Sequence, residues 1–230
     1  MSIYKIGFDD NSYRPLTKHS IVLDLDETLV HSCENMDKLK NLAIYTDPTL
    51  LDLRSRIFRL ALDDMFVEPG AGVRTSLWGV TRPYLTQFLS FCFAYFDVVA
   101  IWSAGQPKYV AAVVDAIFRD VRPPHIVYDY DDCIMDNNDP KKPLIKMILT
   151  EEDLGDYMSL AHTFVLDDRE TTFSQNPDNG IIIPAYVPEA TIEAIREEDR
   201  SLQQLMIWLM RAEVMQAEDI RTLDKTEIFK

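Results

Sequence analysis

Four short apolar runs along the chain have the composition of buried β-strands. They are rich in β-branched and aromatic residues, they cover residues 20–24, 96–102, 161–166 and 180–184, and three of the four end at acidic residues or at proline. Continuous apolar runs without polar alternation are typical of parallel strands that are buried on both faces. The pattern therefore predicts the strands of a central parallel sheet.

Between these runs, apolar residues recur at helical spacing. The predicted helices cover residues 83–95, 107–118, 144–149 and 189–215. The second begins with Pro107, which suits the first turn of a helix, and Tyr109 belongs to the apolar stripe that recurs in it at helical spacing. In the last and longest, Leu202, Leu205, Met206 and Leu209 form one apolar stripe, typical of core packing. Strands that alternate with helices predict an α/β fold.

Residues 35–80 interrupt this alternation. Strand-like segments at 56–62 and 73–78 flank a turn-rich segment at 68–72, so we expect a small antiparallel β insertion here. We expect a single domain over residues 1–230, with a core at about 18–34 and 81–215 and a C-terminal tail at 216–230.

Composition and charge exclude several classes of protein. The chain has 23 Lys and Arg against 38 Asp and Glu, so its net charge is −15. This charge disfavours direct binding to nucleic acid and to anionic membranes. Its three cysteines lack CxxC spacing, so neither a disulfide framework nor a zinc site is expected. With no signal-peptide or membrane-span pattern, we expect a soluble intracellular protein of the nucleus or cytoplasm.

Acidic residues gather where two predicted strands end. Asp24 and Asp26 lie two positions apart at the end of the first strand, and Asp167 and Asp168 follow the third. Open α/β sheets carry their sites at the carboxyl ends of the strands. Because clustered carboxylates repel one another, a hard divalent cation such as Mg²⁺ is expected among them.

These residues stand in a recognisable order of motifs. Residues 24–31 (DLDETLVH) resemble the first motif of the haloacid-dehalogenase superfamily, and more narrowly that of the NLI-interacting-factor-like phosphatases, which act on the C-terminal domain of RNA polymerase II. Further matches follow in order at residues 82–89, 98–104, 142–144, 165–168 and 176–180. The resemblance spans about residues 20–186. It is strongest to the branch that pairs a ubiquitin-like domain with the phosphatase, although the residues before Ser20 are too few for such a domain.

The resemblance implies a fold and an activity. The fold would be a haloacid-dehalogenase, Rossmann-like parallel sheet with helices on both faces and a small antiparallel β insertion. The activity would be that of a Mg²⁺-dependent phosphoserine/phosphothreonine protein phosphatase that works through an aspartyl-phosphate. A phosphoprotein would be its partner, with the RNA polymerase II C-terminal domain one substrate that the resemblance suggests.

The resemblance also implies roles for single residues. Asp24 would be the nucleophile and Asp26 the general acid and base, with Thr28 bonding within the loop to hold Asp26. Ser103, Ala104 and Lys142 would bind the substrate phosphate.

Mg²⁺ would be held by Asp24, by the backbone carbonyl of Asp26 and by Asp168, with Asp167 close by. For the phosphate-binding lysine, Lys141 and Lys146 are alternatives to Lys142, because both lie close to it in the sequence.

Some readings compete with this one. A phosphatase of small molecules or of nucleic-acid ends would carry the same motifs, and so would a catalytically silent binding module of the same fold. The acidic run of residues 129–139 lacks the central glycine and terminal glutamate of a calcium-binding EF-hand loop, so we expect a solvated loop there.

Overall fold

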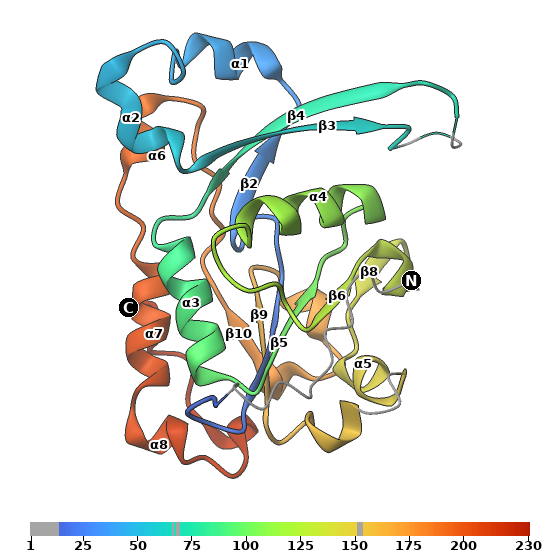
Figure 1. Cartoon of the computed structure of the whole chain (residues 1–230). Helices are drawn as coiled ribbons and strands as arrows, with labels where there is room; N and C mark the ends of the chain where they lie inside the picture. The colour runs from blue at the N-terminus through green and yellow to red at the C-terminus, as the bar shows by residue number, and fades with distance from the viewer. Residues whose placement is uncertain (1–13, 66, 68–69, 151–153) are drawn as a thin grey trace.

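The computed structural model describes residues 14–65, 67, 70–150 and 154–230, and its centre is a parallel β-sheet (Figure 1). The five strands lie in the order β10-β9-β1-β5-β6, and each pairs in parallel with its neighbours. Their bounds are β1 (Ser20–Leu23), β5 (Val98–Trp102), β6 (Ile126–Tyr128), β9 (Thr163–Asp167) and β10 (Gly180–Ile182). The four predicted strands are confirmed, and β6 is an addition.

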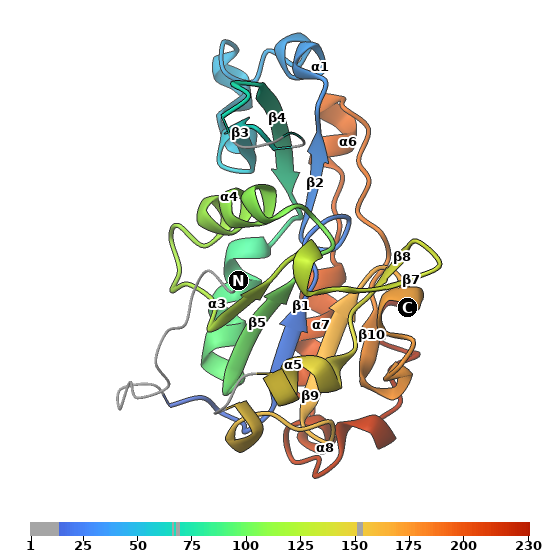
Figure 2. The same ribbon diagram turned by 90° about the vertical axis from the view of Figure 1, so that its right-hand side faces the viewer.

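Helices cover both faces of the sheet, as expected. Ile21 and Leu23 of β1 pack in one cluster with α3 (Leu85–Tyr95), α4 (Pro107–Ile117) and α7 (Ser201–Leu209). Val22 points to the opposite face, where it packs with α5 (Leu144–Thr150). Figure 2 shows α5 on one side of the sheet and α3 and α7 on the other. Burial on both faces explains why β1 has no polar alternation.

The C-terminal region forms three helices, so the prediction of one continuous helix over 189–215 was wrong. They are α6 (Ile192–Arg196), α7 and α8 (Ala212–Met215). The break before α7 consists of four charged residues, among which Asp199 accepts a hydrogen bond of 2.8 Å from Arg82. Asp199 also accepts the Ser201 N–H at 2.9 Å, and local side-chain bonds of this kind compete with a continuing helix. Leu202, Leu205 and Leu209 are fully buried in the core, as the stripe predicted.

The expected antiparallel insertion is present and has one strand more than predicted. Its strands are β2 (Val30–Cys33), β3 (Ile57–Asp63) and β4 (Arg74–Thr81), in the order β2-β4-β3. Since β2 directly follows the acidic loop after β1, this sheet begins before residue 35. Two short helices, α1 (Met36–Asn41) and α2 (Leu51–Arg54), lie between β2 and β3. Within the predicted turn, residues 68 and 69 lie outside the described residues, and Gly70 and Gly72 adopt positive φ.

The acidic run before α5 is largely exposed, as expected of a solvated segment, but it is more regular than a loop. It contains a hairpin of β7 (Ile134–Asp136) and β8 (Asp139–Lys141), joined by Asn137 and Asn138 with positive φ. Two such asparagines suit a tight hairpin turn. Asp129 is buried and caps the short helical turn that precedes the hairpin.

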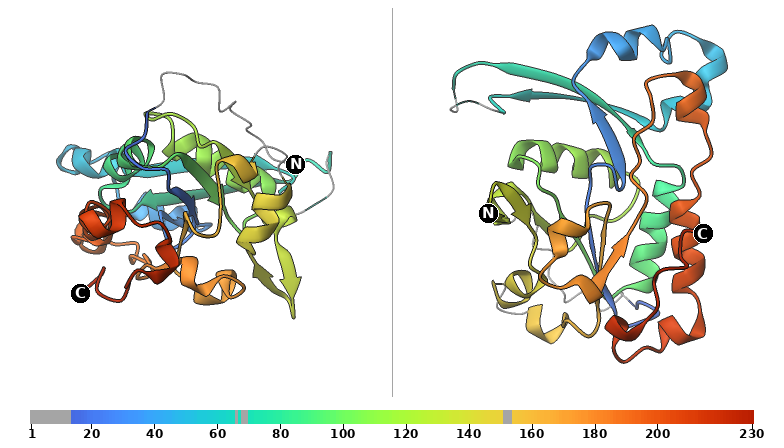
Figure 3. Two further views of the ribbon diagram at one scale, coloured as in Figure 1. Left: turned by 90° about the horizontal axis from the view of Figure 1, so that it is seen from below. Right: turned by 180° about the vertical axis from the view of Figure 1, so that it is seen from behind.

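The residues expected to form a tail also join the core. Ile220 and Ile228 are buried, and the chain ends beside α7, where Gln204 donates a hydrogen bond to the Lys230 carbonyl (Figure 3). None of the helices in the described part of the chain has the length and apolar character of a membrane span.

Candidate active site

Three aspartates meet at the carboxyl ends of β1 and β9. Asp24 follows β1, Asp167 is the last residue of β9, and Asp168 comes next. One carboxylate oxygen from each lies within 4.8 Å of the other two. Asp24 and Asp167 are buried, whereas Asp168 is partly exposed. The sheet thus places together the acids that the sequence predicted to share this edge.

Lys142 is the cation at this cluster. Its side chain is buried, and Nζ donates to Oδ1 of Asp24 and, at 2.7 Å, to Oδ2 of Asp167. Its backbone N–H donates to the Thr172 carbonyl at 2.6 Å, which fixes the lysine in place. Burial alone would lower the pKa of Lys142, but the two carboxylates outweigh it and raise the pKa.

The two alternative lysines have partners outside the acid cluster. Lys141 forms an ion pair of 2.7 Å with Asp139, and Lys146 donates to the Asp132 carbonyl. Of the three, Lys142 is the one that contacts the acid cluster.

The cluster has the donors and the charge for a magnesium ion. One ammonium balances only one of its three carboxylates. Burial and the neighbouring Asp167 raise the pKa of Asp24 despite the opposing effect of Lys142, and burial also raises the pKa of Asp168. Hard oxygen donors with excess negative charge are what Mg²⁺ prefers. The side chain of Asp26 is not part of this cluster.

A tight loop after β1 carries Asp26 and Thr28. Glu27 has a φ of 59° and donates its N–H to the Val30 carbonyl at 2.8 Å, which closes the loop. The Thr28 hydroxyl oxygen accepts the Asp168 N–H at 3.1 Å. This bond joins the two acidic loops and does not lie within the loop of Thr28, where the resemblance places it. The contact holds the ends of β1 and β9 in register.

Arg82 holds the same loop in place through hydrogen bonds. Its guanidinium is fully buried and donates to the Thr28 carbonyl at 3.0 Å and to Asp199 at 2.8 Å. The motif at residues 82–89 therefore begins with a side chain that fixes the acidic loop against the break before α7.

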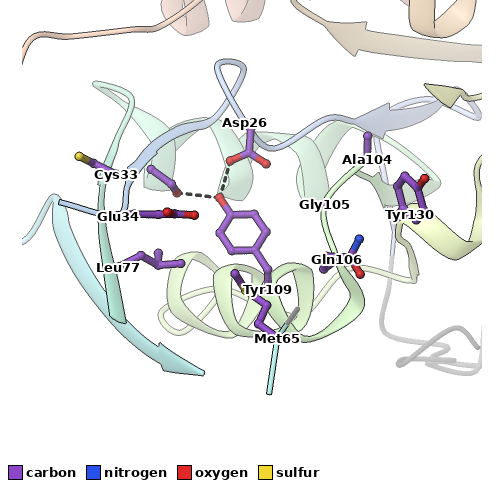
Figure 4. Close-up of a pocket in the computed structure, with 11 residues that line it drawn as sticks. Asp26, Cys33, Glu34, Met65, Leu77, Ala104, Gly105, Gln106, Tyr109 and Tyr130 are labelled. Atoms are coloured by element: carbon purple, nitrogen blue, oxygen red, sulfur yellow. Dashed lines mark hydrogen bonds between the residues drawn. The ribbon is translucent and has the colours of Figure 1, made fainter. Parts of the chain in front are cut away.

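Tyr109, in the first turn of α4, contacts Asp26 (Figure 4). Its hydroxyl donates to Oδ1 of Asp26, and the Ser32 hydroxyl lies 2.6 Å from the same phenolic oxygen. Burial raises the pKa of Asp26 to about 6, although the bond from Tyr109 opposes the shift. Sequence reasoning placed Tyr109 in an apolar stripe and missed this role. The available signal was that a buried tyrosine needs a partner for its hydroxyl.

A cavity of about 400 Å³ opens beside Asp26. Mostly apolar surface faces it, including Met65, Leu77 and the ring of Tyr109, together with Ala104 and Gly105 ahead of α4. Ser103 comes just before them and is buried, and its hydroxyl oxygen accepts the Gly105 N–H at 3.0 Å. The predicted phosphate-binding segment thus adjoins the start of α4, where free backbone N–H groups favour anions.

A family model and several curated proteins match this chain. Residues 19–221 match the family model described as NLI interacting factor-like phosphatase. The chain is 28% identical over 148 residues to the ubiquitin-like domain-containing CTD phosphatase 1 of Xenopus laevis, covering 62% of this chain and 45% of that protein. It is 24% identical over 177 residues to nuclear envelope morphology protein 1 of Saccharomyces cerevisiae, covering 76% and 36%. The chain spans less than half the length of these curated relatives.

Solved structures share the fold. The RNA polymerase II CTD phosphatase Fcp1 superposes with a TM-score of 0.57 at 20% identity, over 74% of this chain and 42% of that one. The fission yeast Fcp1 bound to beryllium fluoride gives a TM-score of 0.58 at 18% identity, over 83% and 51%.

Proposed function

This chain belongs to the family of NLI-interacting-factor-like phosphatases, and we propose that it is a Mg²⁺-dependent phosphoserine/phosphothreonine protein phosphatase that acts through an aspartyl-phosphate. The observation that carries the proposal is the convergence of Asp24, Asp167 and Asp168 around the Lys142 ammonium. Phosphoryl transfer depends mainly on positioning and on neutralising charge, and these residues supply both.

In the first step, a carboxylate oxygen of Asp24 attacks the phosphorus of the substrate. The bond from phosphorus to the serine or threonine oxygen breaks, and Asp26 gives that oxygen its proton. The raised pKa of Asp26, about 6, keeps a fraction of this carboxyl protonated near neutral pH. Lys142 holds Asp24 in position and balances the phosphate charge.

In the second step, the Asp26 carboxylate takes a proton from a water molecule. The oxygen of that water attacks the phosphorus on Asp24, the acyl-phosphate bond breaks, and inorganic phosphate leaves. Splitting one displacement into two in this way is the general advantage of a covalent intermediate. Ser103 and Ala104, ahead of α4, are the residues that we propose for the phosphate oxygens.

Mg²⁺ fits the acidic cluster. Asp24, Asp168 and the backbone carbonyl of Asp26 would hold it, with Asp167 close by. Asp167 is itself engaged, because it accepts bonds from Lys142 and from the hydroxyl of Thr172. When bound, the ion supplies positive charge that ionises Asp24 and draws in the phosphate.

The cavity beside Asp26 supports a protein substrate. Its apolar walls suit a side chain next to a phosphoserine better than they suit a nucleotide. The phosphorylated C-terminal domain of RNA polymerase II is the substrate that the names of the relatives suggest, and we propose it as one phosphoprotein partner.

Phosphate release from a phosphoserine peptide tests the function. Activity should require Mg²⁺, disappear in EDTA, return when Mg²⁺ is restored, and remain low with Ca²⁺, whose looser coordination misplaces the phosphoryl group. Asp24→Asn should lose several orders of magnitude, whereas Asp136→Asn, a matched change at an exposed acid of β7, should not. Full activity in chelated buffer, or an Asp24→Asn activity within tenfold of wild type, would contradict the proposal.

A further inference from the structure

A second groove lies between the inserted sheet and the C-terminal half of α4. It has a volume of about 580 Å³ and is lined by segments of β3 and of the residues before it, facing the end of α4. Figure 1 shows β3 passing over α4 in this region. The charged residues that line it are Arg54, Arg56, Arg59, Asp115, Arg119 and Asp120. In a chain with a net charge of −15, arginines outnumber acids here, and we call this surface the arginine groove.

Two of its arginines are fixed by neutral partners. Arg54 donates to the Ile44 carbonyl at 2.7 Å. Arg56 donates to the Thr81 carbonyl at 2.8 Å and to the Ile195 carbonyl at 2.6 Å. Carbonyl oxygens orient a guanidinium without cancelling its charge. Both positive charges therefore remain at the wall of the groove.

The other two arginines are exposed to solvent. The Arg59 guanidinium lies 5.7 Å from the centre of the Tyr45 ring, a cation–π contact that also leaves its charge uncompensated. Within the described residues, Arg119 has neither a hydrogen bond nor an ion pair from its side chain. Across the same residues, no carboxylate oxygen lies within 4.0 Å of the guanidinium nitrogens of any of the four arginines. The guanidinium groups of Arg59 and Arg119 can therefore donate paired hydrogen bonds to a carboxylate or a phosphate.

We propose that the arginine groove docks an anionic segment of the phosphoprotein substrate, with glutamate, aspartate or phosphoserine side chains, away from the phosphate that is hydrolysed. This inference rests on the proposed function. The helix α4 links the two sites, since Tyr109 near its start lines the cavity beside Asp26 while Asp115 and Arg119 near its end line the groove.

The distance between the sites suits one flexible substrate. The 11 residues of α4 span roughly 16 Å at the rise of an α-helix. About five extended residues cover that length. A substrate held at the groove would present its phosphoserine to Asp24 at a raised effective concentration.

A protein segment fits this groove better than a nucleic acid. Nucleic-acid binding needs many phosphate contacts along a basic track, and here two exposed arginines stand beside the exposed acids Asp115 and Asp120. The strongly negative charge of the whole chain adds repulsion along any long polyanion.

Binding can be measured without turnover. Fluorescence anisotropy of three labelled peptides, one rich in glutamate, one carrying phosphoserines and one with glutamine in their place, would be recorded for the wild-type chain and for Arg59→Gln/Arg119→Gln. We expect the two anionic peptides to bind and the glutamine peptide to bind weakly, with about a fivefold or greater loss of affinity in the double variant. Arg211→Gln/Lys18→Gln removes the same charge from exposed positions outside the groove and should leave binding unchanged.

Turnover connects the groove to the substrate. The value of kcat/KM for a phosphoserine peptide with a distal glutamate stretch should fall in Arg59→Gln/Arg119→Gln. The value for an aryl phosphate, too small to reach the groove, should stay at the wild-type level. If the wild-type chain does not hydrolyse the aryl phosphate at all, the proposed phosphatase function is contradicted. Peptide binding that depends on the two arginines would still support docking at the arginine groove.

Three outcomes of the binding measurements would contradict the proposal that the arginine groove docks an anionic segment. The first is an equal loss of peptide affinity in both double variants. The second is a glutamine peptide that binds as tightly as the anionic peptides. The third is arginine-dependent binding of single-stranded DNA in preference to the anionic peptides. Unchanged kcat/KM for the long peptide would show that the groove does not serve the substrate.

Discussion

The hydroxyl of Tyr109 donates a hydrogen bond to the carboxylate of Asp26, across 83 residues of sequence. The phenol comes from the first turn of α4 and the carboxylate from the loop after β1, so the bond links the helix that follows the proposed phosphate-binding segment to the proposed general acid. Ser32 lies against the same phenolic oxygen at 2.6 Å. Tyr109 therefore fixes the direction in which Asp26 presents its second oxygen.

Tyr109→Phe should lower turnover of a phosphoserine peptide about tenfold, mainly in kcat, because Asp26 would lose the contact that positions it. An aryl phosphate should lose less, since its leaving group needs little protonation. Steady-state kinetics on both substrates measure the difference. Ser32→Ala, which leaves the bond from Tyr109 to Asp26 in place, is the control and should have a smaller effect. Equal losses on both substrates would point to a purely structural role for the phenol.

Asp26→Asn should widen the difference in turnover between the phosphoserine peptide and the aryl phosphate. A serine alkoxide leaves poorly without a proton, so phosphopeptide turnover should fall by roughly 10²–10⁴-fold, while formation of the acyl phosphate from an aryl phosphate should continue. Single-turnover measurements with each substrate show the contrast. If release of the aryl alcohol slowed as much as that of the peptide, Asp26 would have been assigned the wrong role.

His125 should make the fold sensitive to acid. Its Nδ1 accepts the Val99 N–H at 3.0 Å, and burial lowers its pKa from 6.5 to about 4. Because the folded pKa lies below the unfolded one, this contribution to stability is complete above about pH 6.5 and is lost as the pH falls toward 4. Between about pH 8 and about pH 5 the loss should be about 2 kcal/mol.

Urea unfolding at both pH values measures this contribution. In His125→Asn, whose amide oxygen can still accept the Val99 N–H, the change in unfolding free energy between the two values should be smaller by that amount. The same pH dependence in both proteins would show that His125 does not titrate in this range.

Gly79→Ala should destabilise the inserted sheet. Gly79 pairs with Phe58 across β4 and β3, and a Cβ at Gly79 would lie 2.2 Å from Cζ of the Phe58 ring. Overpacking of this kind costs about 1–3 kcal/mol. Thermal unfolding should show the loss, and Gly79→Ala/Phe58→Leu should recover part of it. A double variant no more stable than the single one would mean that the ring is not the obstacle.

The sheet was predictable because its strands are marked in the local sequence. Ile21, Val22 and Leu23 are all apolar since β1 is buried on both faces, and the acids that follow mark its end. β6 has only three residues, Ile126–Tyr128, and a run that short cannot be distinguished from a turn. The break before α7 carries no proline or glycine, and the Asp199 side chain within it accepts hydrogen bonds from Arg82 and from the Ser201 N–H.

The acidic cluster was also predictable, because the ends of parallel strands meet at one edge. Contacts between distant residues were not. Helical spacing correctly placed Tyr109 on a buried face, but its partner Asp26 belongs to another element. In the same way, Thr28 could be marked as a loop residue, whereas its bond to the Asp168 N–H depends on how β1 and β9 pair.

The most direct test of the account is to locate phosphate on the protein during turnover. Asp26→Asn would be mixed with an aryl phosphate and Mg²⁺, quenched rapidly in acid, digested and examined by mass spectrometry. Without its base, the second step should stall, so the account predicts phosphate on Asp24 that hydroxylamine removes, as expected of an acyl phosphate, and none in Asp24→Asn/Asp26→Asn. Release of the aryl alcohol with no phosphate on Asp24, or with phosphate on another residue, would contradict the central claim.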